Sequence, residues 1–109
     1  FEDYLKRTFP SSPVTPNGHN IGFDVAFMRK LAFLGGRDEL LGLSHRAIDT
    51  HTMLYVLVSK GVLPATVLSS DGAFRHFHID VPDKERHTAM GDALATRELV
   101  LKLFRLFEN

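Results

Sequence analysis

The stretch "NGHNIGFDVAFM", Asn17 to Met28, places a charged carboxylate, Asp24, in the opening turns of an otherwise apolar helix. Asn20 is a suitable N-cap residue for that helix. Two adjacent helical faces are apolar, one formed by Phe23, Phe27, Leu31 and Leu34 and the other by Ile21, Val25, Met28 and Ala32. The pattern predicts a largely buried helix that ends at the glycine pair 35–36. A buried aspartate near its beginning requires a chemical explanation.

The composition describes a chain that can fold. It has 109 residues, of which 44% are hydrophobic and 10% aromatic, enough for the packed core of one domain. Thirteen basic residues balance thirteen acidic ones, which excludes a strong overall field for nucleic acid. Cysteine is absent, so disulfides and thiolate metal sites are excluded. No signal-peptide or membrane-spanning pattern is visible, and we expect a soluble, cytoplasmic protein without membrane contact.

The remaining pattern is rich in helices and poor in strands. The predicted elements are the end of a helix at 1–7, a short strand at 14–15, a strand at 45–49, a helix at 50–59, a short helix at 64–70, an irregular segment at 71–86 anchored by Phe74, Phe77 and Ile79, and a helix at 88–107 with Leu94, Leu101 and Phe104 in its buried stripe. This is an α/β pattern with about two short strands. Two strands make a poor sheet, and the chain begins abruptly at Phe1, so we expect a segment upstream.

A second acidic site lies in "RHTAMGDALAT", Arg86 to Thr96. His87 precedes the predicted last helix, and Asp92 lies in its early turns among apolar residues. The positive end of a helix dipole favours a carboxylate at such a position. Taken singly, Asp24 and Asp92 are therefore both explained by helix electrostatics alone.

Taken together, "HNIGFD" and "RHTAMGDA" resemble the second and third motifs, HN-x-x-FD and H-x-A-x-x-DA, of the DEDDh family of 3′–5′ exonucleases. That family includes the proofreading subunit of bacterial DNA polymerase III, ribonuclease T and oligoribonuclease. "AIDT", Ala47 to Thr50, is similar to the family's strand and helix start between these motifs. The resemblance implies a ribonuclease-H-like exonuclease fold, with residues 1–109 as the carboxyl-terminal portion of a single domain.

The resemblance also implies a site. Asp24 and Asp92 are expected to bind two Mg²⁺ or Mn²⁺ ions, which prefer oxygen ligands and stabilise the attacking and leaving oxygens of a phosphodiester. His87 is expected to take the proton of the attacking water, since histidine titrates near neutral pH. A metal ion at Asp24 would explain a buried carboxylate. The substrate would be a single-stranded 3′ end of DNA or RNA, released as nucleoside monophosphates.

Two neighbours of Asp24 have alternative interpretations. By the resemblance, Asn20 and Phe23 contact the terminal nucleotide, but Asn20 could equally serve only as an N-cap and Phe23 only as a core residue. Asp49 is acidic and close to the central motif, and we expect it to cap and orient the following helix. The sequence alone leaves the first two alternatives open.

The chain departs from the family in one respect, since the family's first motif, D-x-E, is not present in it. Two carboxylates do not suffice for two metal ions. The alternative function is therefore a catalytically incomplete exonuclease-like module that binds nucleic acid or a protein partner. A sheet edge left open by missing strands favours pairing with another chain, and the candidate partners are a second copy or a polymerase.

The segment "FRHFH" invites a separate metal interpretation. His76 and His78 would face the same side of a strand, with a spacing suited to a transition metal. Because no cysteine or nearby third ligand accompanies them, we favour a surface segment that touches nucleic acid.

Overall fold

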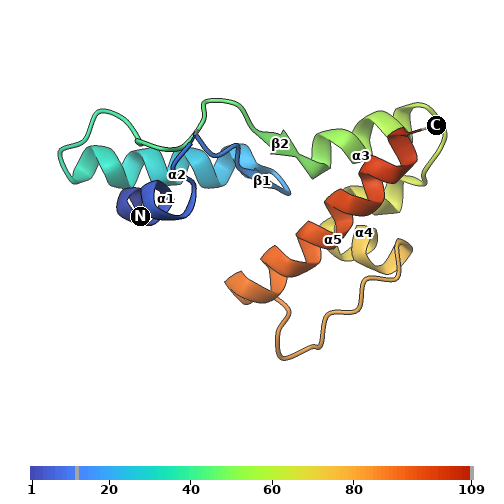
Figure 1. The fold of residues 1–109 in the computed structure, drawn as a ribbon. Helices are drawn as coiled ribbons and strands as arrows, with labels where there is room; N and C mark the ends of the chain where they lie inside the picture. Colours follow the sequence, from blue (N-terminus) through green and yellow to red (C-terminus); the bar gives the residue numbers. More distant parts are fainter. Residues whose placement is uncertain (12, 109) are drawn as a thin grey trace. The chain divides into compact units, whose positions relative to one another are not determined.

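The computed structural model describes residues 1–11 and 13–108. Its elements are α1 (Glu2–Thr8), β1 (Asn17–Gly18), α2 (Ile21–Leu34), β2 (Ile48–Asp49), α3 (Thr50–Ser59), the 3₁₀ helix η1 (Ala65–Leu68), α4 (Ser70–His76) and α5 (Ala89–Phe107), all labelled in Figure 1 except η1. The chain divides into two compact units, one from Phe1 to Asp49 and one from Thr50 on. Within the described residues, no helix is both long and apolar enough to cross a membrane.

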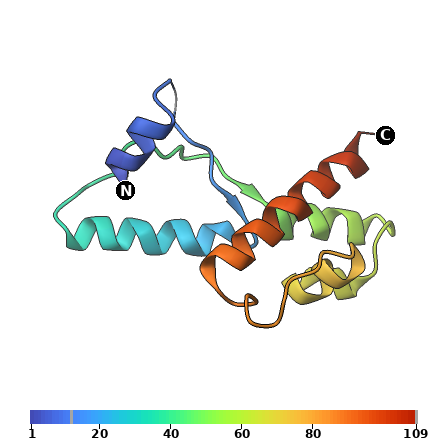
Figure 2. The same cartoon turned by 60° about the horizontal axis from the view of Figure 1, so that its bottom comes forward.

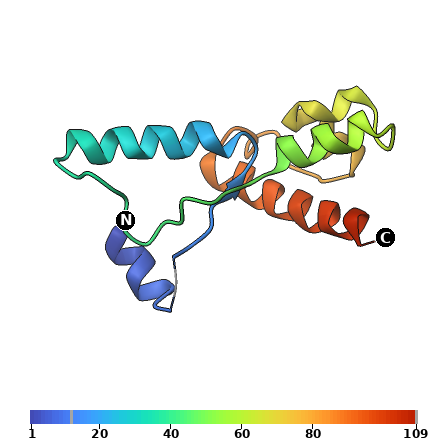
Figure 3. The same ribbon diagram turned by 90° about the horizontal axis from the view of Figure 1, so that it is seen from above.

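The first unit is built around a short parallel strand pair. Asn17 pairs with Ile48 and Gly18 with Asp49, and the two strands run side by side in Figure 3. An isolated parallel bridge between Val14 and Leu43 extends the pairing. The mixed helix–strand pattern is therefore confirmed for the described part of the chain. The strand predicted at 14–15 is displaced, because Val14 forms only this bridge and the ladder begins at Asn17.

Helix α2 begins and ends where the sequence predicts, but its predicted burial is wrong. None of its residues is buried, and Phe23, Phe27 and Leu31 are 77%, 59% and 55% exposed. Figure 2 shows α2 as an unbroken helix that follows β1. The face formed by Ile21, Val25, Met28 and Ala32 is half-buried, whereas the face that carries Phe23 is exposed. Helical spacing reveals which faces are apolar but not what covers them.

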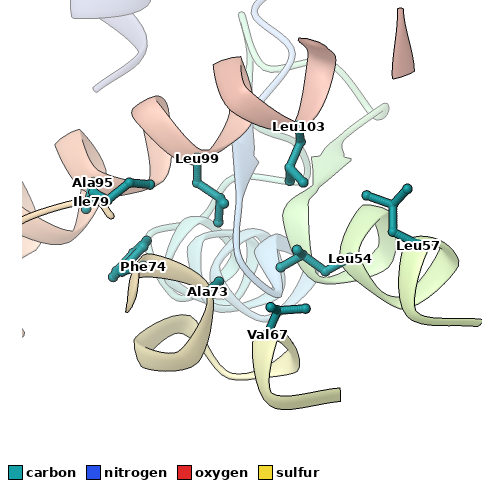
Figure 4. Packing of buried hydrophobic residues seen from close by; sticks show 9 residues of the cluster. All are labelled: Leu54, Leu57, Val67, Ala73, Phe74, Ile79, Ala95, Leu99 and Leu103. Carbon is teal, nitrogen blue, oxygen red and sulfur yellow. The ribbon is translucent and has the colours of Figure 1, made fainter. Parts of the chain in front are cut away.

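The second unit has a continuous hydrophobic core. Its buried members come from α3, η1, α4, the loop after α4 and α5, and they are Leu54, Leu57, Val67, Ala73, Phe74, Ile79, Ala95, Leu99 and Leu103 (Figure 4). The predicted anchors Phe74 and Ile79 are confirmed as core residues, and Phe77 packs half-buried against them. Burial of this cluster fixes α5 against α3 and α4.

The predicted buried stripe of α5 is wrong. Leu94, Leu101 and Phe104 are 55%, 46% and 44% exposed, whereas the core side is formed by Ala95, Leu99 and Leu103. These three residues are spaced at i, i+4 and i+8, the interval that places side chains on one helical face. Because α5 carries leucine on more than one face, periodicity alone allowed two stripes.

The segment after Leu68 is more regular than predicted. Residues 70–76 form α4, and the Ser69 hydroxyl caps it by accepting a hydrogen bond from the backbone N–H of Gly72 at 3.0 Å. His76 ends this helix, and His78 has a left-handed backbone with φ of 56°. The strand proposed for "FRHFH" is therefore wrong, and with it the facing pair of histidines.

Replacing Leu99 with alanine tests this core. Leu99 is fully buried, so Leu99→Ala should lower the free energy of unfolding by about 2–5 kcal/mol through lost burial and a cavity. Leu94→Ala makes the same chemical change on the exposed side of α5 and should cost less than about 1 kcal/mol. Urea unfolding of both variants measures the difference, and equal losses would contradict the observed orientation of α5.

Candidate functional site

The ends of β1 and β2 bring the second-motif residues together. Parallel strands place their carboxyl ends at the same edge, so the turn after β1 lies beside the last residue of β2. A cavity of about 600 Å³ opens there, lined by His19, Asn20, Gly22, Phe23, Asp24 and Asp49. All of these residues belong to the first unit. Four of them are residues that the resemblance selected from the HN-x-x-FD pattern.

Asn20 holds the turn in an uncommon conformation. Its backbone is left-handed, with φ of 57° and ψ of 44°, a region that asparagine tolerates better than most residues. Its backbone N–H donates a hydrogen bond to Oδ1 of Asp49 at 2.9 Å. Asn20 is the N-cap residue of α2 by position, but its side chain makes no capping hydrogen bond. The predicted N-cap position of Asn20 is therefore confirmed, although its side chain does not cap the helix, and Asp49 ties β2 to the start of α2.

Phe23 and Asp24 both point to the surface. Phe23 is 77% exposed, which excludes the alternative that it serves only as a core residue of this unit. Asp24 is exposed in the first turn of α2, so its predicted burial is wrong. The positive helix end favours the carboxylate there without any desolvation cost. The cavity thus presents an exposed ring and an exposed carboxylate next to each other in the sequence.

Asp92 lies in the first turn of α5 and is held by two donors. Its Oδ1 accepts a hydrogen bond from Nη1 of Arg86 at 2.5 Å and from the backbone N–H of His87 at 3.1 Å. His87 itself is exposed and has a left-handed backbone with φ of 71°. The predicted position of His87 immediately before the last helix is confirmed, while its role stays a prediction.

The loop before α5 is fastened to the helix start. The Thr88 hydroxyl accepts a hydrogen bond from the Gly91 N–H at 3.1 Å and donates one to the carbonyl oxygen of Glu85 at 2.6 Å. Gly91 allows this close approach, because a Cβ atom there would lie 2.3 Å from the same carbonyl oxygen. The conformation of residues 85–88 therefore depends on the absence of a side chain at position 91.

Arg86 is the site residue that the sequence interpretation missed. Besides Asp92, its guanidinium contacts Asp71 (Nε to Oδ1, 2.8 Å) and the hydroxyl of Ser70 (2.9 Å). It also lies 5.1 Å from the ring centroid of Phe74, within cation–π range. Arg86 lowers the pKa of the Asp71 carboxyl below its usual 3.8, through the hydrogen bond first and its charge second. Its position next to the third motif was the only sequence signal.

The candidate metal ligands are suitable in kind but too few. Asp24 and Asp92 offer the oxygen atoms that hard cations prefer. However, no group of three or more His, Cys, Asp or Glu side chains in the described part of the chain could hold a metal ion. Asp24 belongs to the first unit and Asp92 to the second. These residues alone therefore do not make a complete metal site.

Comparison with known proteins finds an informative relative. Over 86 residues the chain is 36% identical to a protein of Rhodobacter capsulatus named DNA polymerase III subunit epsilon-like protein. The aligned part is 78% of this chain and 11% of that protein, so the chain spans only a small share of its relative's length. No family model matches the chain. No solved structure matches it either.

A methyl group at position 91 should disturb the loop that carries His87. Gly91→Ala places its Cβ against the Glu85 carbonyl, and relieving that overlap should cost about 1–3 kcal/mol of stability. Gly22→Ala is the matched control, because a Cβ there meets nothing within 4 Å; replacing a helical glycine should be neutral or stabilise by up to about 1 kcal/mol. Thermal unfolding compares the two, and a Gly91→Ala protein as stable as Gly22→Ala would refute the close approach.

The Arg86–Asp71 contact should be visible in an acid titration. Because the pKa of Asp71 is lowered in the folded protein, its contribution to stability is present above the unfolded pKa and is lost as the pH falls through the folded pKa. Arg86→Met should return the pKa of Asp71 toward 3.8. Carboxyl NMR of Asp71 between acidic and neutral pH measures this, and an unchanged midpoint in the variant argues against the contact.

Proposed function

We propose that this chain is the carboxyl-terminal portion of a metal-dependent 3′–5′ exonuclease domain with a ribonuclease-H-like fold. The domain would hydrolyse terminal phosphodiester bonds of single-stranded DNA or RNA and release nucleoside monophosphates. The observation that carries the proposal is the cavity lined by His19, Asn20, Phe23 and Asp24, the residues of the HN-x-x-FD pattern. The likeness to a protein named DNA polymerase III subunit epsilon-like supports the exonuclease family at a general level.

The cavity has features suited to a nucleotide. The ring of Phe23 is largely exposed, so a base can stack on it. Asn20 lies beside it in the turn and can hydrogen-bond through its side-chain amide, which is not used to cap α2. We assign both residues to binding of the terminal nucleotide at a single-stranded 3′ end.

The carboxylates Asp24 and Asp92 are assigned to metal binding, with two Mg²⁺ or Mn²⁺ ions in the complete site. Bound divalent ions supply charge stabilisation at the phosphate and a more acidic attacking water. Further oxygen ligands must join these two aspartates, since the described residues hold no cluster of three. In the family that the sequence resembles, the D-x-E motif fills this need.

His87 is assigned as the general base. Its side chain is exposed and can exchange protons with solvent, and imidazole is the side chain most often used for proton transfer in catalysis. The His87 backbone N–H also holds Oδ1 of Asp92 at 3.1 Å. The assigned base and the assigned ligand are therefore tied to each other at the start of α5.

A nuclease assay on the intact protein tests the proposal. With 5′-labelled single-stranded DNA and RNA oligonucleotides, shortening from the 3′ end should require Mg²⁺ or Mn²⁺ and stop with a chelator. Asp24→Asn and Asp92→Asn should reduce cleavage to background, and His87→Ala should slow it by about 10²–10⁴-fold. Glu98→Gln, which neutralises an exposed carboxylate elsewhere on α5, should cut normally.

Two results would contradict the assignment. Wild-type rates in both Asp92→Asn and His87→Ala would remove the third-motif residues from the chemistry, and chelator-resistant cleavage would remove the metal. An oligonucleotide with a blocked 3′ end distinguishes exonuclease from endonuclease action, because only the latter shortens it.

The second candidate function is a module that binds without cutting. The shortage of metal ligands among the described residues favours it for the chain on its own. Its partners would be a single-stranded 3′ end, a second copy of the chain or a polymerase. Fluorescence anisotropy with a labelled oligonucleotide measures binding, and the nuclease assay on the same oligonucleotide measures cleavage. A module that binds nucleic acid without cutting would give binding with no cleavage at any Mn²⁺ concentration.

A further inference from the structure

Arg86 places a positive charge next to Asp92, the carboxylate to which the proposed function assigns a divalent cation. Its guanidinium contacts Oδ1 of Asp92 at 2.5 Å and Oδ1 of Asp71 at 2.7 Å. The Arg86 side chain is only 15% exposed, and the Phe74 ring and the Ser70 hydroxyl also contact it. It is therefore a fixed charge rather than a mobile surface one.

Asp92 stays accessible in spite of this contact. Its side chain is 38% exposed, and within residues 13–108 the hydrogen bonds that reach its carboxylate both end on Oδ1. Oδ2 is thus the oxygen that an incoming cation can use. A cation bound there would share one carboxylate with Arg86 and lie only a few ångströms from its guanidinium.

We infer that Arg86 is the resident counter-cation of Asp92, and that a divalent cation reaching this carboxylate has to compete with it. The inference rests on the proposed function. Repulsion between a divalent ion and a guanidinium about 6 Å away corresponds to about a tenfold loss of affinity in water-like surroundings. Arg86 therefore holds the Asp92 carboxylate in its orientation without metal and weakens metal binding when metal is present.

Asp71 modulates this competition from α4. It contacts the same Arg86 guanidinium as Asp92, so its negative charge partly offsets the positive potential of Arg86 at Asp92. Neutralising Asp71 removes this offset. The attraction of a divalent cation to Asp92 then becomes weaker. Arg86 and Asp71 should consequently shift metal affinity in opposite directions.

Titration of the intact protein with Mn²⁺, followed by the electron paramagnetic resonance of free Mn²⁺, tests the inference. Arg86→Met should bind Mn²⁺ about 3–10-fold more tightly than the wild type. Arg86→Lys keeps the charge and should stay within about twofold, while Asp71→Asn should bind about 2–5-fold more weakly. Arg97→Gln removes an exposed charge of the same sign elsewhere on α5 and serves as the control.

The outcomes separate the inference from the proposed function. Unchanged or weaker Mn²⁺ binding in Arg86→Met overturns the inference, since Arg86 would then serve only to anchor the loop. If Arg86→Met does not fold, Asp71→Asn decides, because this side chain is 62% exposed; wild-type or tighter binding in that variant overturns the inference. If Asp92→Asn binds Mn²⁺ as the wild type does, the proposed ligand assignment fails instead.

A metal-free measurement tests the ion pair by itself. With a chelator present, Arg86→Met and Asp92→Asn should each lower the melting temperature by a few degrees, and the double variant should lose clearly less than the sum of the two. Additive losses would show that the two side chains do not interact, which overturns the inference whatever the result with Mn²⁺.

Discussion

Burial of one face of α5 is the constraint on which the second unit depends. Ala95, Leu99 and Leu103 are fixed against α3, η1 and α4 by the exclusion of water from their side chains. Once that face is buried, the rotation of the helix about its axis is set. Asp92, less than one turn before Ala95, must then emerge at the partly exposed beginning of the helix. The apolar packing of α5 therefore also determines where the Asp92 carboxylate lies.

Polar contacts then fix the details at that helix start. The Thr88 hydroxyl accepts a hydrogen bond from a backbone N–H in the first turn of α5. The Asp92 carboxylate in the same turn accepts hydrogen bonds from the backbone of His87 and the guanidinium of Arg86. The close approach of the loop is possible because position 91 carries no side chain. Stability and the candidate chemistry therefore use the same few residues, and a substitution here is expected to alter both.

Local signals in the sequence predicted much of this fold. The bounds of α2, α3 and α5 followed from N-cap residues, glycine stops and helical spacing. What failed were statements about burial, such as the stripe through Leu94 on α5 and the burial of the Phe23 face of α2, because burial depends on what packs against a helix and not on the helix itself. The regular segment α4 was missed, since "SDGAFRH" shows little periodicity and its cap lies at Ser69.

The candidate site was predictable to a similar extent. A motif resemblance selected Asn20, Phe23 and Asp24, and the structure gathers them around one cavity. Arg86 could not be assigned a role from sequence, because its partner Asp71 lies fifteen residues upstream. Contacts across such a loop depend on three-dimensional packing, which no short spacing rule encodes.

The left-handed backbone of Asn20 affects how any substitution at that position has to be interpreted. Alanine would remove the amide and at the same time disfavour a φ of 57°, so it would disturb the turn and its hydrogen bond to Asp49. Glycine would remove the amide but accept the backbone conformation. Asn20→Gly thus isolates the contribution of the side chain to the proposed nucleotide binding, whereas Asn20→Ala combines the loss of the side chain with a change in the backbone of the turn.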